Sequence, residues 1–183
     1  MKKIFSLLPV FLMTIFLTSC SDDDDVVDRL RTISDVPASA EVSVDYLPIN
    51  VFEIPVETDL DLRQLIEDEL GTDEALDQVK EVELDDMDIV FLNAEDQENF
   101  DFVNSVTLGI RTDDLDYKEV AFLDEIPSGA TTLDLNTLDD VFIDDYAKSE
   151  SLKLVVQFES TEDATDLNLN MEMEFDAKLD PSL

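Results

Sequence analysis

The last segment of the chain, residues 167–179, alternates apolar and polar residues without a break. A period of two places successive side chains on opposite faces of a β-strand. The segment therefore predicts a strand with one face in a core and the other in solvent. Seven apolar residues share the first face: Leu167, Leu169, Met171, Met173, Phe175, Ala177 and Leu179.

The same alternation predicts further strands earlier in the chain. Acidic residues dominate the polar faces, and only antiparallel sheets commonly leave one face solvated. The fold class is therefore expected to be mainly β, an antiparallel β-sandwich of about eight strands. Adjacent Asp85 and Asp86 shift the phase of one strand and predict a β-bulge. The other strands are expected at 42–46, 51–56, 79–91, 103–112, 120–122, 133–135 and 152–158.

Two segments change to a helical period and predict two short helices at the rim of the sandwich. In residues 58–71, Leu62, Leu65 and Ile66 fall on one helical face, with Thr58 as the expected N-cap and Gly71 at the end. In residues 136–148, Asn136 is the expected cap.

The charge balance restricts the partners. The chain has 47 acidic and 11 basic residues, a net charge of −36. Such a charge repels nucleic acids, so we expect no nucleic-acid partner. Because 44% of residues are apolar, we interpret the chain as a folded domain with an acidic surface rather than as a disordered chain.

The first 19 residues have the pattern of a secretory signal peptide. Lys2 and Lys3 precede an apolar run, residues 4–17, that is shorter than the roughly 20 residues of a membrane span. The sequence Leu17-Thr18-Ser19-Cys20 resembles the lipobox of bacterial lipoproteins. The resemblance implies signal-peptidase cleavage before Cys20 and a covalent lipid on its thiol. An ordinary signal peptide followed by a chance free cysteine is the alternative.

Four aspartates follow the cysteine: Ser21 precedes Asp22, Asp23, Asp24 and Asp25. This run is similar to the acidic export signal of some bacterial lipoproteins, which implies lipid anchoring in the outer membrane, with exposure on the cell exterior as the further expectation. A solvated tether is a compatible alternative. The expected organisation is a signal peptide over 1–19, a flexible, lipidated acidic tether over 20–39 and the β-sandwich domain over 40–183. The whole resembles small surface lipoproteins of unassigned function.

The composition favours a non-catalytic protein. The chain has no His, and its three Gly form no phosphate-binding loop. Among so many acids, no chosen carboxylate pair points to a hydrolase. We therefore expect no enzyme activity and no cofactor apart from the lipid on Cys20.

Calcium is the one metal ion that the sequence suggests. Asp113, Asp114 and Asp116 fall in one expected loop, and carboxylate oxygens are the ligands that Ca²⁺ prefers. A solvated acidic loop is the alternative. Other acidic groups lie at Asp85, Asp86 and Asp88 and at Asp144 and Asp145.

The sequence thus predicts a lipid-anchored accessory or interaction domain of the cell envelope, with an unknown protein or small-molecule partner. Two alternatives remain open. One is a carrier of an apolar ligand or lipid, with a cavity between the sheets lined by Met171, Met173 and Phe175, because Met adapts to varied shapes. The other is a weak Ca²⁺-binding surface module.

Overall fold

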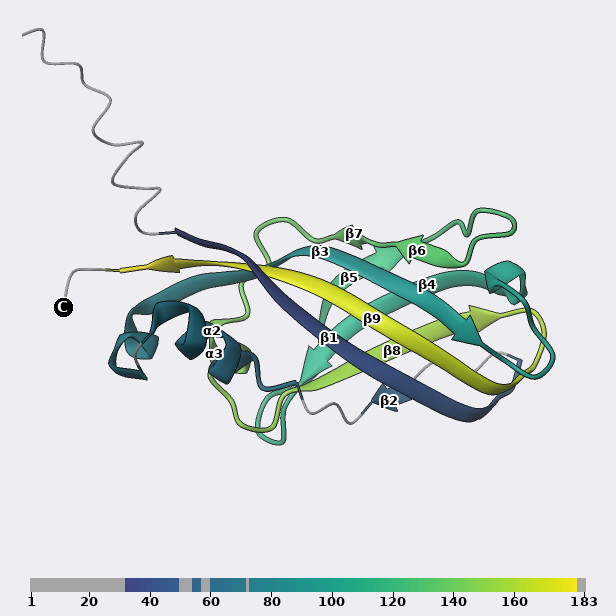
Figure 1. Cartoon of the computed structure of the whole chain (residues 1–183), viewed down its shortest axis with the longest axis horizontal. Coiled ribbons are helices and arrows are strands. Elements are labelled where there is room, and N and C mark those ends of the chain that lie inside the picture. Colours follow the sequence, from purple (N-terminus) through teal and green to yellow (C-terminus); the bar gives the residue numbers. More distant parts are fainter. Residues whose placement is uncertain (1–31, 50–53, 57–59, 72, 181–183) are drawn as a thin grey trace, which may run out of the picture. The chain divides into compact units, whose positions relative to one another are not determined.

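The computed structural model describes residues 32–49, 54–56, 60–71 and 73–180. Nine strands in this part of the chain form two antiparallel sheets, which lie face to face over one hydrophobic core (Figure 1). The predicted mainly β, sandwich-like fold is confirmed. The compact unit spans Arg31–Leu183.

The first sheet contains four strands in the order β1-β9-β3-β6. These are β1 (Thr32–Leu47), β9 (Ala164–Leu179), β3 (Val79–Asn93) and β6 (Thr132–Asp134). Strand β9 pairs antiparallel with β1 on one side and with β3 on the other. The last strand in sequence is therefore central in this sheet.

The second sheet contains five strands in the order β2-β8-β4-β5-β7. They are β2 (Ile54–Val56), β8 (Lys153–Ser160), β4 (Val103–Arg111), β5 (Lys118–Leu123) and β7 (Asn136–Thr137). Both edges of this sheet are very short strands, which limits the unpaired backbone that they expose.

The alternation of residues 167–179 becomes the alternation of burial along β9. Six of its seven apolar side chains, from Leu167 to Ala177, are buried, and Leu179 is half-buried. They share one hydrophobic core with large buried side chains of the second sheet, including Phe158 and Leu108. The bulge predicted at Asp85 and Asp86 is also confirmed, because the register of β3 against β9 shifts between Leu84 and Asp86.

The tether expected over 20–39 extends too far. Residues 32–39 form the first half of β1, where Ile33, Val36 and Ala38 are buried against β9. The alternation was hidden there because a bulge separates Ile33 from Val36, so that these two apolar residues stand three positions apart. Residues 20–31 lie outside the described part of the chain.

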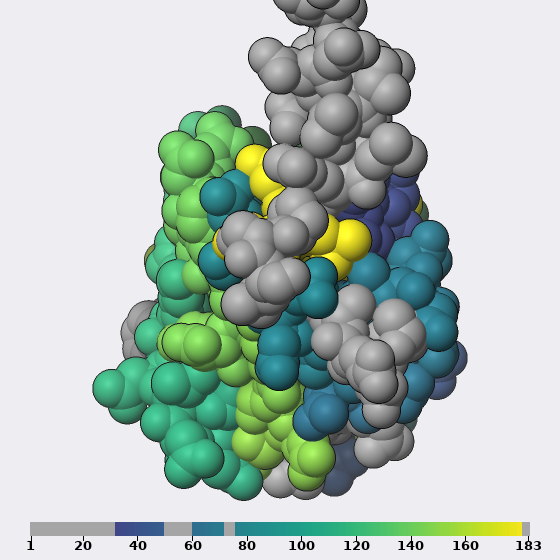
Figure 2. All heavy atoms as spheres, turned by 90° about the vertical axis from the view of Figure 1, so that its left-hand side faces the viewer, coloured from purple at the N-terminus to yellow at the C-terminus, as the bar shows by residue number. Residues whose placement is uncertain are grey.

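The first predicted helix is confirmed, with a later start. Helix α2 spans Leu62–Leu70, buries Leu62 and Ile66, and ends at Gly71, whose φ of 68° is left-handed. Its N-cap is Asp61, whose carboxylate accepts the backbone N–H of Gln64 at 3.0 Å. The expected cap, Thr58, lies outside the described residues. Helix α2 lies beside β1, at the end of the sandwich where β1 begins (Figure 1, Figure 2).

The second predicted helix, over 136–148, is wrong in most of its length. Asn136 does not cap a helix, because Asn136 and Thr137 form β7 at the edge of the second sheet. Asp140 has a φ of 59°, which interrupts a right-handed helix. Only α3 (Asp144–Ala147) is helical. Strand pairing with β5 therefore overrides the local helical pattern.

Two short 3₁₀ helices complete the described elements. They are η1 (Asp73–Gln78), which leads into β3, and η2 (Phe100–Phe102), which leads into β4. Phe100 is fully buried and packs edge-on against Phe91 at a centroid distance of 5.5 Å. The η2 turn thus closes one end of the core with aromatic side chains.

Because β9 is central in its sheet, we expect substitutions on its two faces to differ sharply in their effect on the free energy of unfolding. Met171→Ala removes a side chain that is 0% exposed, and we expect it to lower the free energy of unfolding by about 2–5 kcal/mol. Glu172→Ala, on the solvent face of the same strand, should change it by less than about 0.5 kcal/mol. Urea unfolding followed by circular dichroism measures both. Equal effects would show that β9 does not have this orientation.

Candidate functional site

Carboxylates gather on the solvent side of the first sheet. The strand register places Glu83 opposite Asp176 and Asp86 opposite Glu174. Asp88 lies opposite Glu172 on one side and Asp134 on the other. Like charges in directly opposed positions destabilise a sheet. We term this surface the acidic face, and it consists of Asp35, Glu83, Asp85, Asp86, Asp88, Asp134, Glu172, Glu174 and Asp176.

Two bulges at the same level of β9 bring three of these aspartates together. In β1 the register shifts between Ile33 and Val36, and Asp35 has a φ of 59°. In β3 the register shifts between Leu84 and Asp86. Val36 and Leu84 both pair with Phe175, so the two bulges flank β9 beside Asp176.

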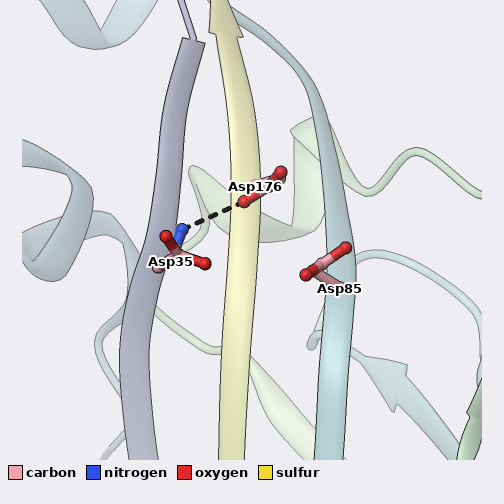
Figure 3. A group of neighbouring side chains, drawn as sticks. All are labelled: Asp35, Asp85 and Asp176. Carbon is pink, nitrogen blue, oxygen red and sulfur yellow. Dashed lines mark hydrogen bonds between the residues drawn. The ribbon is translucent and has the colours of Figure 1, made fainter.

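The resulting group is Asp35, Asp85 and Asp176, on three neighbouring strands (Figure 3). One carboxylate oxygen from each lies within 4.8 Å of the others, and within the described part of the chain this is the one group of three such ligands. Asp176 also accepts the backbone N–H of Asp35 at 3.0 Å. We term these three residues the aspartate triad.

The surroundings oppose ionisation on this face. Partial burial, followed by the charges of Asp176 and Asp35, raises the pKa of Asp85 above its ordinary value of 3.8. Burial and the neighbouring acids raise the pKa of Asp88 in the same way. Burial also raises the pKa of Glu83, although the ammonium of Lys178 acts against it. The acidic face is thus a surface where protonation or a bound cation would relieve repulsion.

A hollow of about 360 Å³ adjoins the triad at Asp85. Its other walls include Glu83 and the segment 137–140, which contributes Asp139 and Asp140. The hydroxyl of Thr137 donates to the backbone carbonyl of Asp85 at 3.2 Å and holds this segment against β3. Four carboxylates therefore line one small hollow.

The structure does not bring together the three aspartates of the predicted calcium loop. Thr112 shapes this loop, because its hydroxyl accepts the backbone N–H groups of Asp114 and Leu115 at 3.2 and 2.9 Å. Asp113 instead pairs with the ammonium of Lys153 at 3.0 Å. The backbone carbonyl of Asp116 accepts the hydroxyl of Tyr146. Within this loop, the Thr112 hydroxyl binds the backbone next to Asp113, and Lys153 binds the Asp113 carboxylate.

Sequence reasoning found one member of the triad and missed two. Asp85 belonged to an acidic group singled out with its chain neighbours, whereas Asp35 and Asp176 lie far away in sequence. The spacing of apolar residues does indicate the two bulges that bring the triad together. Ile33 and Val36, like Leu84 and Met87, stand three positions apart in otherwise alternating segments, which indicates a bulge in each strand.

The predicted lipidation and export residues, 17–25, lie outside the described part of the chain. Within the described part, no helix has the length and apolar character needed to cross a membrane.

Two further hollows lie elsewhere on the sandwich. One, of about 400 Å³, is lined by polar residues of α2, among them Arg63 and Glu67, and by Glu150. The other, of about 130 Å³, lies over β4 and β8 and includes Thr107 and Gln157. None of the three hollows has the mainly apolar lining that an apolar ligand requires. These three sites therefore give the carrier alternative no support.

Comparisons with known proteins leave the family open. No protein-family model and no curated protein sequence matches the chain. Among solved structures, a chain of Cocksfoot mottle virus matches over 83% of this chain and 86% of its own length. The two are 7% identical, with a TM-score of 0.33. This score is too low for an argument about fold or function, so the architecture stands on the strand pairing alone.

The ligand count limits what the triad can do with a metal ion. Ca²⁺ takes six to eight oxygen ligands, and three carboxylates supply at most half of them without bidentate binding. An ion held there would keep much of its water shell. The triad alone therefore supplies too few ligands for a complete Ca²⁺ coordination shell.

Removing one triad charge should stabilise the fold at neutral pH. We expect Asp85→Asn to raise the melting temperature at pH 7 by about 1–3 °C. The wild type gains stability as the pH falls through the raised pKa of Asp85 toward 3.8, and the variant lacks this gain. The difference should therefore shrink on acidification. Calorimetry between pH 7 and pH 4 measures it.

Asp45→Asn is the matched control, because it removes one exposed charge from β1 outside the triad. Equal shifts for both variants at pH 7 would refute the local repulsion.

The same two variants, Asp85→Asn and Asp45→Asn, distinguish specific ion binding from charge screening. We expect millimolar Ca²⁺ and Mg²⁺ at matched ionic strength to raise the melting temperature almost equally. A Ca²⁺-specific increase that Asp85→Asn abolishes would instead identify a calcium site.

Proposed function

We propose that this chain is a lipid-anchored, non-catalytic accessory or interaction domain of a bacterial cell envelope, held in the outer membrane. The observation that carries the proposal is the sequence Leu17-Thr18-Ser19-Cys20, which places the only cysteine of the chain three positions after the end of a short apolar run. Signal-peptidase cleavage before Cys20 would make it the first, lipidated residue.

The distance between anchor and fold supports a domain kept close to the membrane. Strand β1 begins at Thr32, twelve peptide steps after Cys20. A fully extended chain of this length spans at most about 40 Å. The sandwich would therefore stay within roughly one domain diameter of the lipid surface.

The charge distribution supports a role in binding other molecules rather than lipid. A net charge of −36 and the acidic face repel anionic headgroups, so the domain would stand off the bilayer and present its solvent surface to partners. The partner in this proposal is a protein or small molecule of the envelope. Residues Asp22 to Asp25 support placement on the outer face.

Loss of Cys20 should detach the protein. We expect the wild type to incorporate radiolabelled palmitate and to enter the outer-membrane fraction, whereas Cys20→Ala should lose both the label and that location, since no other thiol is present to carry the lipid. Ser39→Ala, an exposed change elsewhere, should behave as the wild type. A Cys20→Ala protein that still reaches the outer membrane would refute the anchor.

The side of the outer membrane on which the domain lies can be tested separately. Protease added to intact cells should remove the domain if the four aspartates direct it to the exterior, and should spare a periplasmic control protein. Replacing Asp22 to Asp25 by Asn should then protect the domain without removing the lipid. Complete protection of the wild type would place the domain on the inner face and contradict this part of the proposal.

A further inference from the structure

The longest edge in the fold is β1. It forms one border of the four-stranded sheet over 16 residues, whereas the opposite border, β6, has three. Within the described residues no strand pairs with the far side of β1. An edge strand displays a row of backbone N–H and C=O groups that a further strand can pair with.

The usual protections of an edge strand are confined to the first half of β1. The bulge at Asp35 and the ring of Pro37 interrupt the edge there, and α2 lies at the end of the sandwich where β1 begins (Figure 1). From Val36 to Leu47 the register against β9 is unbroken. Strand β1 contains no Lys or Arg, the side chains that most often discourage strand addition. Among the described residues, 38–47 therefore form an edge without a bulge, a proline or a paired strand, and its charged side chains are Glu41 and Asp45.

The position of Pro37 indicates which backbone groups face outward. Proline has no N–H, so within a sheet it is tolerated where the nitrogen points away from the neighbouring strand. Backbone direction alternates along a strand, and therefore every second residue after Pro37 shares its orientation. The outward groups are those of Ser39, Glu41, Ser43 and Asp45, and their side chains are all exposed on the solvent face.

The core-facing side of the same edge is incompletely covered. Val42 is buried, but Ala40 and Val44 are only half-buried, although they pack against the hydrophobic core. Near the end of the strand the Tyr46 side chain is 55% exposed. An added strand would shield Ala40 and Val44 with the side chains that it directs toward the core.

The acidic side chains of β1 and β9 indicate which polar side chains an added strand should carry. Glu41 and Asp45 point to the solvent face, where β9 adds Glu172 and Glu174. We propose that residues 38–47 of β1 accept an extended segment of another protein, in which apolar residues alternate with Lys or Arg. The apolar residues would cover Ala40 and Val44, and the cations would lie over the acids. This inference rests on the proposed function, because it names the partner chemistry of the interaction domain.

A second copy of this chain fits the edge poorly. Two β1 strands paired over residues 38–47 would bring together Glu41 and Asp45 from both molecules, and this segment contains no cation. Each molecule also carries a net charge of −36, which opposes close approach. The charge pattern therefore selects a cationic partner rather than self-pairing.

Two synthetic ten-residue peptides of equal composition test the proposal. One alternates Lys and Val, and the other has five Lys followed by five Val. Each is added to the full-length protein in a non-ionic detergent at about 150 mM salt, where charges separated by more than about 8 Å are largely screened. The alternating peptide should bind at least about tenfold more tightly, because only it can direct all its Val side chains to one face. It should also slow amide hydrogen exchange at Ser39, Glu41, Ser43 and Asp45.

The variant Ser43→Pro tests one outward backbone N–H of β1. The ring removes one outward N–H while leaving the ladder to β9 intact, so binding of the alternating peptide should weaken by about tenfold. Ser43→Ala is the control, since both variants lose the hydroxyl that donates to Asn168 at 2.5 Å, and only the proline loses the N–H. Circular dichroism checks that both variants are folded, and the exchange measurement on the wild type does not depend on either.

Equal binding of both peptides without amide protection would overturn the proposal and show general charge attraction only. Protection of the β1 amides that increases with protein concentration, with no peptide present, would overturn it in favour of self-association. The anchor is tested separately by Cys20→Ala. Peptide binding by a protein that proves unlipidated would refute the anchor alone, and a lipidated protein that binds neither peptide would refute only the strand-addition site.

Discussion

The pairing of β9 with strands on both sides is the interaction on which the rest of the fold depends. Its apolar residues from Leu167 to Ala177 are buried in the core, and its backbone connects β1 to β3. Neither of these strands pairs with the other, so the four-stranded sheet has no continuity without β9. Burial of this one strand face thus supports both the sheet and the acidic face on its opposite side.

Repulsion within the acidic face destabilises the fold, and burial of the hydrophobic core compensates for it. Opposed carboxylates on β3, β9 and β6 repel one another, and the pKa values of Asp85 and Asp88 are raised as a result of burial and this repulsion. A few cations reduce the cost at its margin, such as Lys178, which pairs with Glu81 at 2.7 Å. Such a surface is well suited to solvent exposure and to cationic partners.

The sequence predicted those features that depend on local periodicity. The strand face of β9, the left-handed end of α2 at Gly71 and the bulge at Asp85 and Asp86 each follow from a few neighbouring residues. The start of β1 was missed because a bulge and Pro37 disguise its alternation. The segment 136–148 has a helical pattern that pairing with β5 overrides, and no local signal reveals that competition.

The aspartate triad illustrates a second kind of limit. Its members come from β1, β3 and β9, and their proximity depends on the register of two strand pairs and on the level of two bulges. The apolar spacing indicates each bulge separately, but not that both occur beside Phe175. Prediction of such a group from one sequence would require the pairing partners first.

The order of the strands affects how the chain folds as it emerges. The first described strand pairs with the last, and the bond between Asp35 and Asp176 joins residues 141 positions apart. Contacts of such high sequence separation slow folding. A chain that emerges with its N-terminus first, from a ribosome or through a membrane pore, cannot complete the four-stranded sheet until its last residues arrive. Until then Ile33, Val36 and Val42 lack the neighbouring strand with which β1 pairs in the finished sheet.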